Sequence, residues 1–137
     1  MRYGYDIGGA EWPIDPVSMS VVDILTPDSK EHGECDVFIR DLNSPTWTNE
    51  LAPRPIVYLG RILRYLDKAR LGEIGLELDA IVSRGGQIII FDWMAVIEPV
   101  LQSLTDGAKL VNLDLINLRA EDREADWRAV ILIGDSF

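Results

Sequence analysis

Few residues of this sequence have the types and spacing that catalysis needs. The chain has one histidine, His32, and one cysteine, Cys35, three positions apart. A cysteine nucleophile needs an imidazole within hydrogen-bonding distance of its sulfur, and this spacing neither requires nor excludes that arrangement. A zinc site would have to add carboxylates such as Glu31 or Glu34, without the paired ligand spacing of structural zinc sites. We therefore expect a surface histidine, a buried thiol and no bound metal.

Asp92 is the carboxylate best placed for a catalytic role. It ends an unbroken apolar run and is followed by Trp93. An aromatic wall can raise the pKa of a carboxyl group and suit it to acid–base catalysis. Such a mechanism needs a second group, for which the candidates are Asp23, Glu98 and Asp114. The alternative, which we favour, is that Asp92 caps the N-terminus of the helix that follows.

No phosphate-binding loop is predicted. Gly85 and Gly86 precede a strand, whereas a phosphate loop joins a strand to a helix N-terminus. Gly8 and Gly9 are not followed by a lysine. We therefore expect no cofactor.

The net charge of −10, from 23 acidic and 13 basic residues, is the most distinctive global property. Such a surface repels phosphate backbones, so we expect no direct binding of nucleic acid. It attracts a basic protein partner, although acidity could also serve solubility alone. The middle of the chain, residues 51–84, is mildly basic. Its Arg61, Arg64 and Lys68 are expected to form a solvated helix face that pairs with acids.

Length and composition indicate one domain spanning residues 1–137. The chain is 47% hydrophobic and 26% charged, which is ordinary for a globular protein. A single cysteine excludes an internal disulfide. The first residues lack the apolar core of a signal peptide, and no apolar run is long enough to span a membrane. We expect a cytoplasmic protein without membrane contact.

The sequence is organised around residues 87–92, a short apolar run after Gly85-Gly86. A run bounded in this way predicts a strand buried on both faces, which requires a layer of structure on each side. We therefore expect a single α+β domain. Its sheet should be mixed or antiparallel, with about five strands, and two or three helices should pack on it.

Alternating apolar residues predict the other strands. Residues 17–25 and 34–40 are expected to pair as an antiparallel hairpin, and residues 111–115 and 127–133 as a second one. Residues 3–16 contain too many glycines and prolines for more than a short strand. The strand at 127–133 is apolar on both faces, so it should be internal or lie at the interface of a homodimer.

Apolar spacing of three and four residues predicts the helices. Residues 56–71 form the clearest candidate, because Gly72 follows as a stop signal. Residues 73–83 fit both the helical and the strand period, and we favour a helix. A last helix is predicted at about 94–105, with Pro99 delaying or kinking its start.

A compact acidic domain without a recognisable catalytic group favours a role in binding. We hypothesise an immunity protein, which is not an enzyme, that inhibits a cognate bacterial toxin, most often a nuclease, by masking its active site. Opposite charge would speed association, and aromatic anchors would add affinity. The expected contacts are two acidic clusters and a loop tryptophan: Asp28, Glu31, Glu34 and Asp36; Glu121, Asp122, Glu124 and Asp126; and Trp47.

Three alternatives remain. The first is a phage-encoded inhibitor that mimics nucleic acid and would carry regularly spaced surface carboxylates. The second is a small enzyme that uses Asp92 and another carboxylate as acid and base. The third is a subunit of an oligomer, for which a large exposed apolar patch would be the sign.

Overall fold

The computed structural model describes residues 4–7, 19–23, 37–39, 41–49, 51–104, 108–113 and 126–134. For residues 19–23, 37–39 and 108–113 it describes the backbone alone. The elements in chain order are β1 (Gly4–Ile7), β2 (Met19–Asp23), β3 (Val37–Ile39), the 3₁₀ helix η1 (Pro45–Thr48), β4 (Ile56–Gly60), the 3₁₀ helix η2 (Leu63–Tyr65), α1 (Lys68–Ser83), β5 (Gln87–Trp93), α2 (Met94–Leu101), β6 (Ala108–Leu113) and β7 (Trp127–Gly134).

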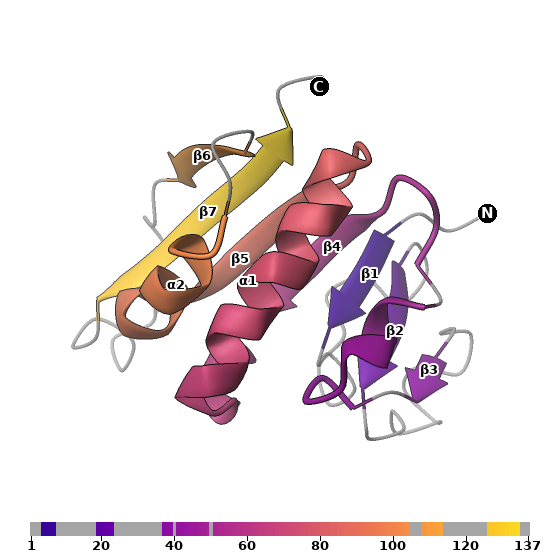
Figure 1. The fold of residues 1–137 in the computed structure, drawn as a ribbon, viewed down its shortest axis with the longest axis horizontal. Coiled ribbons are helices and arrows are strands. Elements are labelled where there is room, and N and C mark those ends of the chain that lie inside the picture. Colours follow the sequence, from indigo (N-terminus) through magenta and orange to yellow (C-terminus); the bar gives the residue numbers. More distant parts are fainter. Residues whose placement is uncertain are drawn as a thin grey trace.

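All described strands belong to one seven-stranded sheet with the order β3-β2-β1-β4-β5-β7-β6. Strands β1 to β5 are parallel, and β7 runs antiparallel to both of its neighbours, β5 and β6. The chain therefore builds the sheet outward from β1 to β3. It then returns to the other side of β1 and continues from β4 in the opposite direction (Figure 1).

The expected mixed sheet with two or three helices is confirmed in outline. Within the described residues two α-helices pack on a mixed sheet, which has seven strands instead of about five. Strand 87–92 and the final antiparallel pair are confirmed as β5 and as β6 with β7. The short strand expected within residues 3–16 is β1.

The predicted hairpin of residues 17–25 and 34–40 is wrong in its direction. Both strands exist, as β2 and β3, but they are parallel, with Val21 beside Val37 and Asp23 beside Ile39. Alternating apolar residues indicate a half-buried strand and carry no information about its direction. Parallel neighbours need a connection of about 10–12 residues or more, and residues 24–36 between these strands provide it.

The predicted helix over residues 56–71 is also wrong. These residues form β4, then η2, and only then the start of α1 at Lys68. Val57 and Leu59 are fully buried whereas Tyr58 between them is half-buried, which is the alternation of a strand. The apolar residues of β4 and of the following turn fall at intervals of three and four, so they imitate a helix.

Residues 73–83 are helical, as favoured, within α1. The helix turns one apolar side inward through Leu71, Ile74 and Leu78, which are almost completely buried. Gly85 follows with φ of +94°, a conformation that glycine adopts without strain. The helix predicted at about 94–105 is α2, and it begins at Met94 despite Pro99 in its second half.

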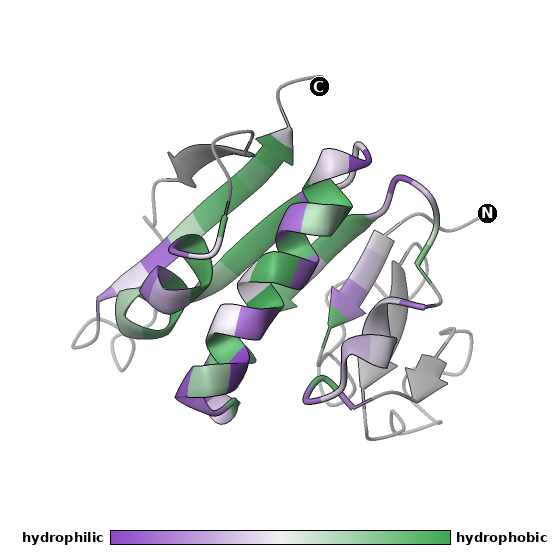
Figure 2. Ribbon diagram, viewed as in Figure 1, coloured by the Kyte–Doolittle hydropathy of each residue, from purple (hydrophilic) through white to green (hydrophobic). Residues whose placement is uncertain are grey.

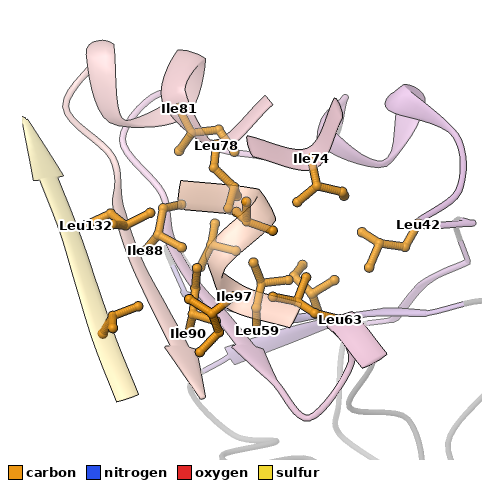
Figure 3. Packing of buried hydrophobic residues seen from close by; sticks show 14 of the residues in the cluster. Leu42, Leu59, Leu63, Ile74, Leu78, Ile81, Ile88, Ile90, Ile97 and Leu132 are labelled. Carbon is orange, nitrogen blue, oxygen red and sulfur yellow. The ribbon is translucent and has the colours of Figure 1, made fainter. Parts of the chain in front are cut away.

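Both α-helices cover the same face of the sheet (Figure 1). Figure 2 shows that apolar residues concentrate in β4, β5 and β7, whereas hydrophobic and hydrophilic residues alternate along α1. The core lies between these layers, where Leu78 of α1 and Ile97 of α2 meet Ile88 and Ile90 of β5 (Figure 3). None of the helices within the described residues is long and apolar enough to cross a membrane.

Candidate functional site

The topology indicates where a ligand would bind. Open α/β sheets bind ligands outside the carboxyl ends of their parallel strands, at the point where the strand order reverses. In this sheet the reversal lies between β1 and β4, which are neighbours although β2 and β3 separate them in the sequence. The candidate site is therefore the row of carboxyl ends of β1 to β5, which we call the carboxyl edge.

Aspartates mark the carboxyl edge. Among the described parallel strands, each one except β4 has an aspartate within two residues of its carboxyl end: Asp6 in β1, Asp23 in β2, Asp41 after β3 and Asp92 in β5. Asp6 is 3% exposed and Asp92 is fully buried, whereas Asp41 is exposed. Carboxylates accept hydrogen bonds from hydroxyl and amino groups and favour positive charge. The edge thus suits a ligand that carries such groups.

Tyr58 of β4 contributes a hydroxyl group to this edge. Tyr58 lies beside Asp6 in the parallel register of β1 and β4. A Cβ atom added to Gly60 would overlap the hydroxyl end of the Tyr58 ring, so this ring extends over Gly60 toward the carboxyl end of β4. Burial raises the pKa of Tyr58, as does Asp6, while Arg61 lowers it. The hydroxyl is therefore neutral near pH 7 and can both donate and accept.

Asp92 binds backbone groups on both sides of it. Its Oδ2 accepts a hydrogen bond of 3.1 Å from the N–H of Leu63, and its Oδ1 accepts one of 2.8 Å from the N–H of Trp93. Burial raises the pKa of Asp92, and these hydrogen bonds and Arg64 oppose the rise. Leu63 is the first residue of η2, so Asp92 caps η2. The prediction that it caps α2 is wrong, because Trp93 occupies that position without a side-chain hydrogen bond.

Arg61 and Arg64 gather three aromatic rings at the carboxyl ends of β4 and β5. We call Arg61, Arg64, Phe91, Trp93 and Trp127 the arginine–indole cluster. The Arg64 guanidinium carbon lies 4.4 Å from the ring centre of Trp93 and 4.7 Å from that of Trp127. Arg61 lies 5.1 Å from the Trp127 centre and 5.4 Å from that of Phe91. The solvated basic helix face predicted for Arg61 and Arg64 is therefore wrong.

A backbone conformation directs the first arginine into this cluster. Arg61 has φ of +58°, which is uncommon outside glycine. Its N–H donates to the Phe91 carbonyl at 2.7 Å and so extends the ladder between β4 and β5 by one bond. The chain then leaves the sheet and enters η2, which carries Arg64. Sequence spacing alone contains no signal for this turn.

Trp47, predicted as an exposed anchor, is fully buried. Its indole N–H donates to Oε1 of Glu77 on α1, and the same oxygen accepts a hydrogen bond of 2.8 Å from Arg70. The Glu77 hydrogen bond is the main cause that raises the pKa of Arg70. This network ties η1 to α1, so Trp47 supports the fold and presents no surface to a partner.

Asp126 is the one member of the two acidic clusters within the described residues. It is exposed and forms an ion pair of 3.1 Å with the exposed Arg128. The other predicted contacts lie outside the described residues, as do His32 and Cys35: Asp28, Glu31, Glu34, Asp36, Glu121, Asp122 and Glu124. Among the residues that the structure describes, no group of three or more potential metal ligands comes together.

The fold has close counterparts in solved structures, although no family model matches the chain and no curated protein is similar to it. The N-methyltransferase NodS from Bradyrhizobium japonicum, solved with S-adenosyl-L-homocysteine, superposes with a TM-score of 0.68 and 12% identity over 96% of this chain and 77% of its own. An O-methyltransferase family protein from Burkholderia thailandensis gives 0.67 and 13%, over 97% of this chain and 51% of its own.

An S-adenosylmethionine-dependent methyltransferase from Archaeoglobus fulgidus gives a TM-score of 0.60 and 15% identity, over 96% of this chain and 85% of its own. The fold of this chain resembles that of these methyltransferases. It spans about half of the Burkholderia protein and larger shares of the other two. At such low identity the likeness concerns the fold alone.

These comparisons contradict the hypothesis of an immunity protein and the expectation that the chain is not an enzyme. Five of the similar structures are described as methyltransferases or methylases. The same comparisons contradict the hypothesis of a phage-encoded inhibitor. The error arose because net acidity was interpreted as a surface for a basic protein, whereas several of the acids lie at the carboxyl edge of the sheet.

The sequence does contain a signal that spacing analysis missed. Short apolar runs end in aspartate again and again, at Tyr5-Asp6, Val22-Asp23, Ile39-Arg40-Asp41 and Phe91-Asp92. In parallel sheets of this type an acidic residue after the second strand accepts hydrogen bonds from a ribose. The repeated pattern could have indicated a nucleotide-type ligand.

Proposed function

We propose that this chain binds S-adenosylmethionine at its carboxyl edge and transfers the methyl group to a small acceptor. The observation that carries the proposal is the sheet itself, with its reversal between β1 and β4 and its antiparallel β7. Methyltransferases from three organisms share this fold. Two of their descriptions name S-adenosylmethionine or its demethylated product S-adenosyl-L-homocysteine.

The residues present suit this cofactor chemically. S-adenosylmethionine carries ribose hydroxyls, an amino group and a positively charged sulfur that supplies an electrophilic methyl group. Asp23 ends β2, the position from which an acidic residue accepts hydrogen bonds from ribose hydroxyls. Asp6 and Asp41 add negative charge to the same edge, and the neutral Tyr58 hydroxyl adds a donor. Gly8 and Gly9 follow β1 directly in the sequence.

The connection between β1 and β2 is short for a pair of parallel strands. Residues 8–18 connect β1 to β2, and this is near the shortest crossover, about 10–12 residues, that joins parallel strands. Both described α-helices cover one face of the sheet (Figure 1).

The expectation of no cofactor arose from a search for phosphate-binding loops, and S-adenosylmethionine has no phosphate. The missing lysine after Gly8-Gly9 is therefore no argument against it.

Isothermal titration calorimetry with S-adenosylmethionine and S-adenosyl-L-homocysteine tests the proposal. We expect saturable one-to-one binding of both ligands. Asp23→Asn should weaken binding by about tenfold or more, because hydrogen bonds to a charged acceptor contribute about 1.5–3 kcal/mol. Glu98→Gln, on the exposed side of α2, is the matched control and should bind like the wild type. A folded protein that binds neither ligand at millimolar concentration would exclude the proposed function.

A further inference from the structure

The arginine–indole cluster contains more hydrogen-bond donors than acceptors. Three of its nitrogen atoms are buried and have no hydrogen-bond partner: Nε of Arg64, Nε1 of Trp93 and Nε1 of Trp127. An unpaired buried donor costs about 1–3 kcal/mol, and most proteins leave few such groups. Here the three belong to one cluster of side chains, because the Trp93 and Trp127 rings both lie near the Arg64 guanidinium.

The nearest carboxylate does not satisfy these donors. Asp92 Oδ1 lies 3.6 Å from Arg64 Nε, which is too long for a hydrogen bond. Both Asp92 oxygens already accept backbone N–H groups, from Leu63 and Trp93. Asp126 lies next to Trp127 in the sequence, but it pairs with Arg128 at the surface. Asp92 thus forms an ion pair with Arg64 and leaves its Nε without a hydrogen bond.

The ring faces of the cluster are already in use. Phe91 stacks on Trp127 with ring centres 4.9 Å apart, and Trp93 meets the same ring edge-on at 6.0 Å. The guanidinium groups of Arg61 and Arg64 lie close to the Trp127 ring as well. The chemistry that remains unused is N–H donation by Arg64 and the two indole rings. An oxyanion supplies what the cluster lacks.

A carboxylate fits better than a phosphate. Guanidinium groups bind the planar carboxylate through two parallel hydrogen bonds. A dianionic phosphate would meet stronger repulsion from the buried Asp92 and from a molecule of net charge −10. The Arg64 side chain is 16% exposed, so part of it is accessible from solvent.

The cluster adjoins the proposed cofactor edge. Tyr58 connects the two, because both Asp6 of β1 and Arg61 of the cluster influence its pKa. We propose that Arg64, Trp93 and Trp127, supported by Arg61, bind the carboxylate of a small organic acid. This acid is the methyl acceptor, an assignment that rests on the proposed function. The cluster would hold the carboxylate and leave the remainder of the acid directed along the carboxyl edge.

Benzoate, benzamide and phenyl phosphate are suitable probes, followed by tryptophan fluorescence and by calorimetry on the whole chain. Benzoate should bind saturably, and benzamide, which has the same shape without charge, should bind at least about tenfold more weakly. Arg64→Gln should weaken benzoate binding about tenfold or more without changing the affinity for S-adenosylmethionine. Trp127→Phe keeps a ring but removes one donor, and it should weaken benzoate about three- to tenfold.

Arg84→Gln, at the far end of α1, is the control and should bind all probes like the wild type. Denaturation midpoints of each variant establish that it is folded. The proposal is overturned if folded wild type binds benzoate no better than benzamide, or if Arg64→Gln leaves benzoate binding unchanged. Tighter binding of phenyl phosphate would overturn the choice of a carboxylate. Benzoate binding that depends on Arg64, without any S-adenosylmethionine binding, would uphold the anion site and refute the methyl-acceptor role.

Discussion

At the scale of single residues, Asp92 shows how position determines the role of a carboxylate. It is fully buried at the end of β5 and accepts N–H groups from Leu63 and Trp93. These bonds fix the turn that brings Arg64 over the indole rings. We therefore assign Asp92 to positioning, because both of its oxygens are occupied by the backbone.

The raised pKa of Asp92 predicts a pH dependence of stability. An unfolded aspartate titrates near its ordinary value of 3.8, and burial moves the folded value upward. Between these two values the folded protein binds more protons than the unfolded chain, so stability falls as pH rises through this interval. The asparagine of Asp92→Asn does not titrate in this range. The unfolding free energy of the wild type minus that of Asp92→Asn should therefore fall from pH 3.5 upward and then reach a plateau.

Urea unfolding of both proteins at a series of pH values measures this difference. Subtracting the unfolding free energy of the variant from that of the wild type at each pH removes the contribution of the other titrating groups, because the two proteins share most of them. A raised pKa of Asp92 would be contradicted if this difference in unfolding free energy stays constant with pH. It would also be contradicted if the wild type becomes more stable relative to the variant as pH rises. The amide also places an NH₂ group against a backbone donor, so the variant should be less stable than the wild type at the acidic end.

At the scale of elements, the contact between α1 and α2 depends on a small residue. A Cβ atom on Gly75 would overlap the Val100 carbonyl oxygen and lie 2.6 Å from Ser103 Cβ. Gly72, one turn earlier on α1, has room, because the nearest atom to an added Cβ is Ser103 Oγ at 3.7 Å. The two glycines share a helix and differ in what they face.

This difference predicts opposite effects of one substitution. Gly72→Ala should raise the free energy of unfolding by about 0.5–1 kcal/mol, since alanine is the better helix former. Gly75→Ala should lower it by about 1–3 kcal/mol, since α2 must move to admit the methyl group. Chemical denaturation of the two variants provides the comparison, and each serves as the control of the other. Equal shifts of the same sign would refute the close approach of α1 and α2.

Elements were predicted from the sequence where one local pattern dominated. The apolar run of β5 and the alternation of β7 identified both strands, and Gly85-Gly86 correctly separated α1 from β5. The helix prediction was wrong for residues 56–66 because a strand followed by a 3₁₀ turn reproduces helical spacing. The parallel pairing of β2 with β3 depends on the crossover between them, so alternation within each strand could not reveal it.

The candidate site was harder to predict than the elements, since its residues meet only through the topology. Asp6, Asp23 and Asp41 share an edge because β1, β2 and β3 are parallel neighbours. Arg64 and Trp127 lie far apart in the sequence and meet because β7 inserts beside β5. Asp92 was recognised as a special position, but its partner at Leu63 could not be inferred.

At the scale of the whole molecule, the net charge of −10 acquires a different meaning. It was first interpreted as attraction for a basic protein. With aspartates at the carboxyl ends of four parallel strands, part of this charge stands where the proposed ligand binds. The field of the molecule would then favour S-adenosylmethionine, whose sulfonium gives it a net positive charge, over neutral S-adenosyl-L-homocysteine.

Salt should therefore act differently on the two ligands. A ligand that binds only the folded state at 100 times its dissociation constant stabilises it by about 2.7 kcal/mol. At a fixed ligand concentration and low ionic strength, S-adenosylmethionine should raise the thermal midpoint more than S-adenosyl-L-homocysteine does. Because 0.15 M salt reduces the screening length to about 8 Å, the difference between the two midpoints should narrow as sodium chloride is added. Thermal melts with each ligand and without ligand, from low salt to 0.5 M, measure the difference between the two midpoints.

If salt does not change this difference, the acidic edge contributes no long-range attraction. A larger midpoint shift by the neutral S-adenosyl-L-homocysteine at low salt would refute this role of the aspartates.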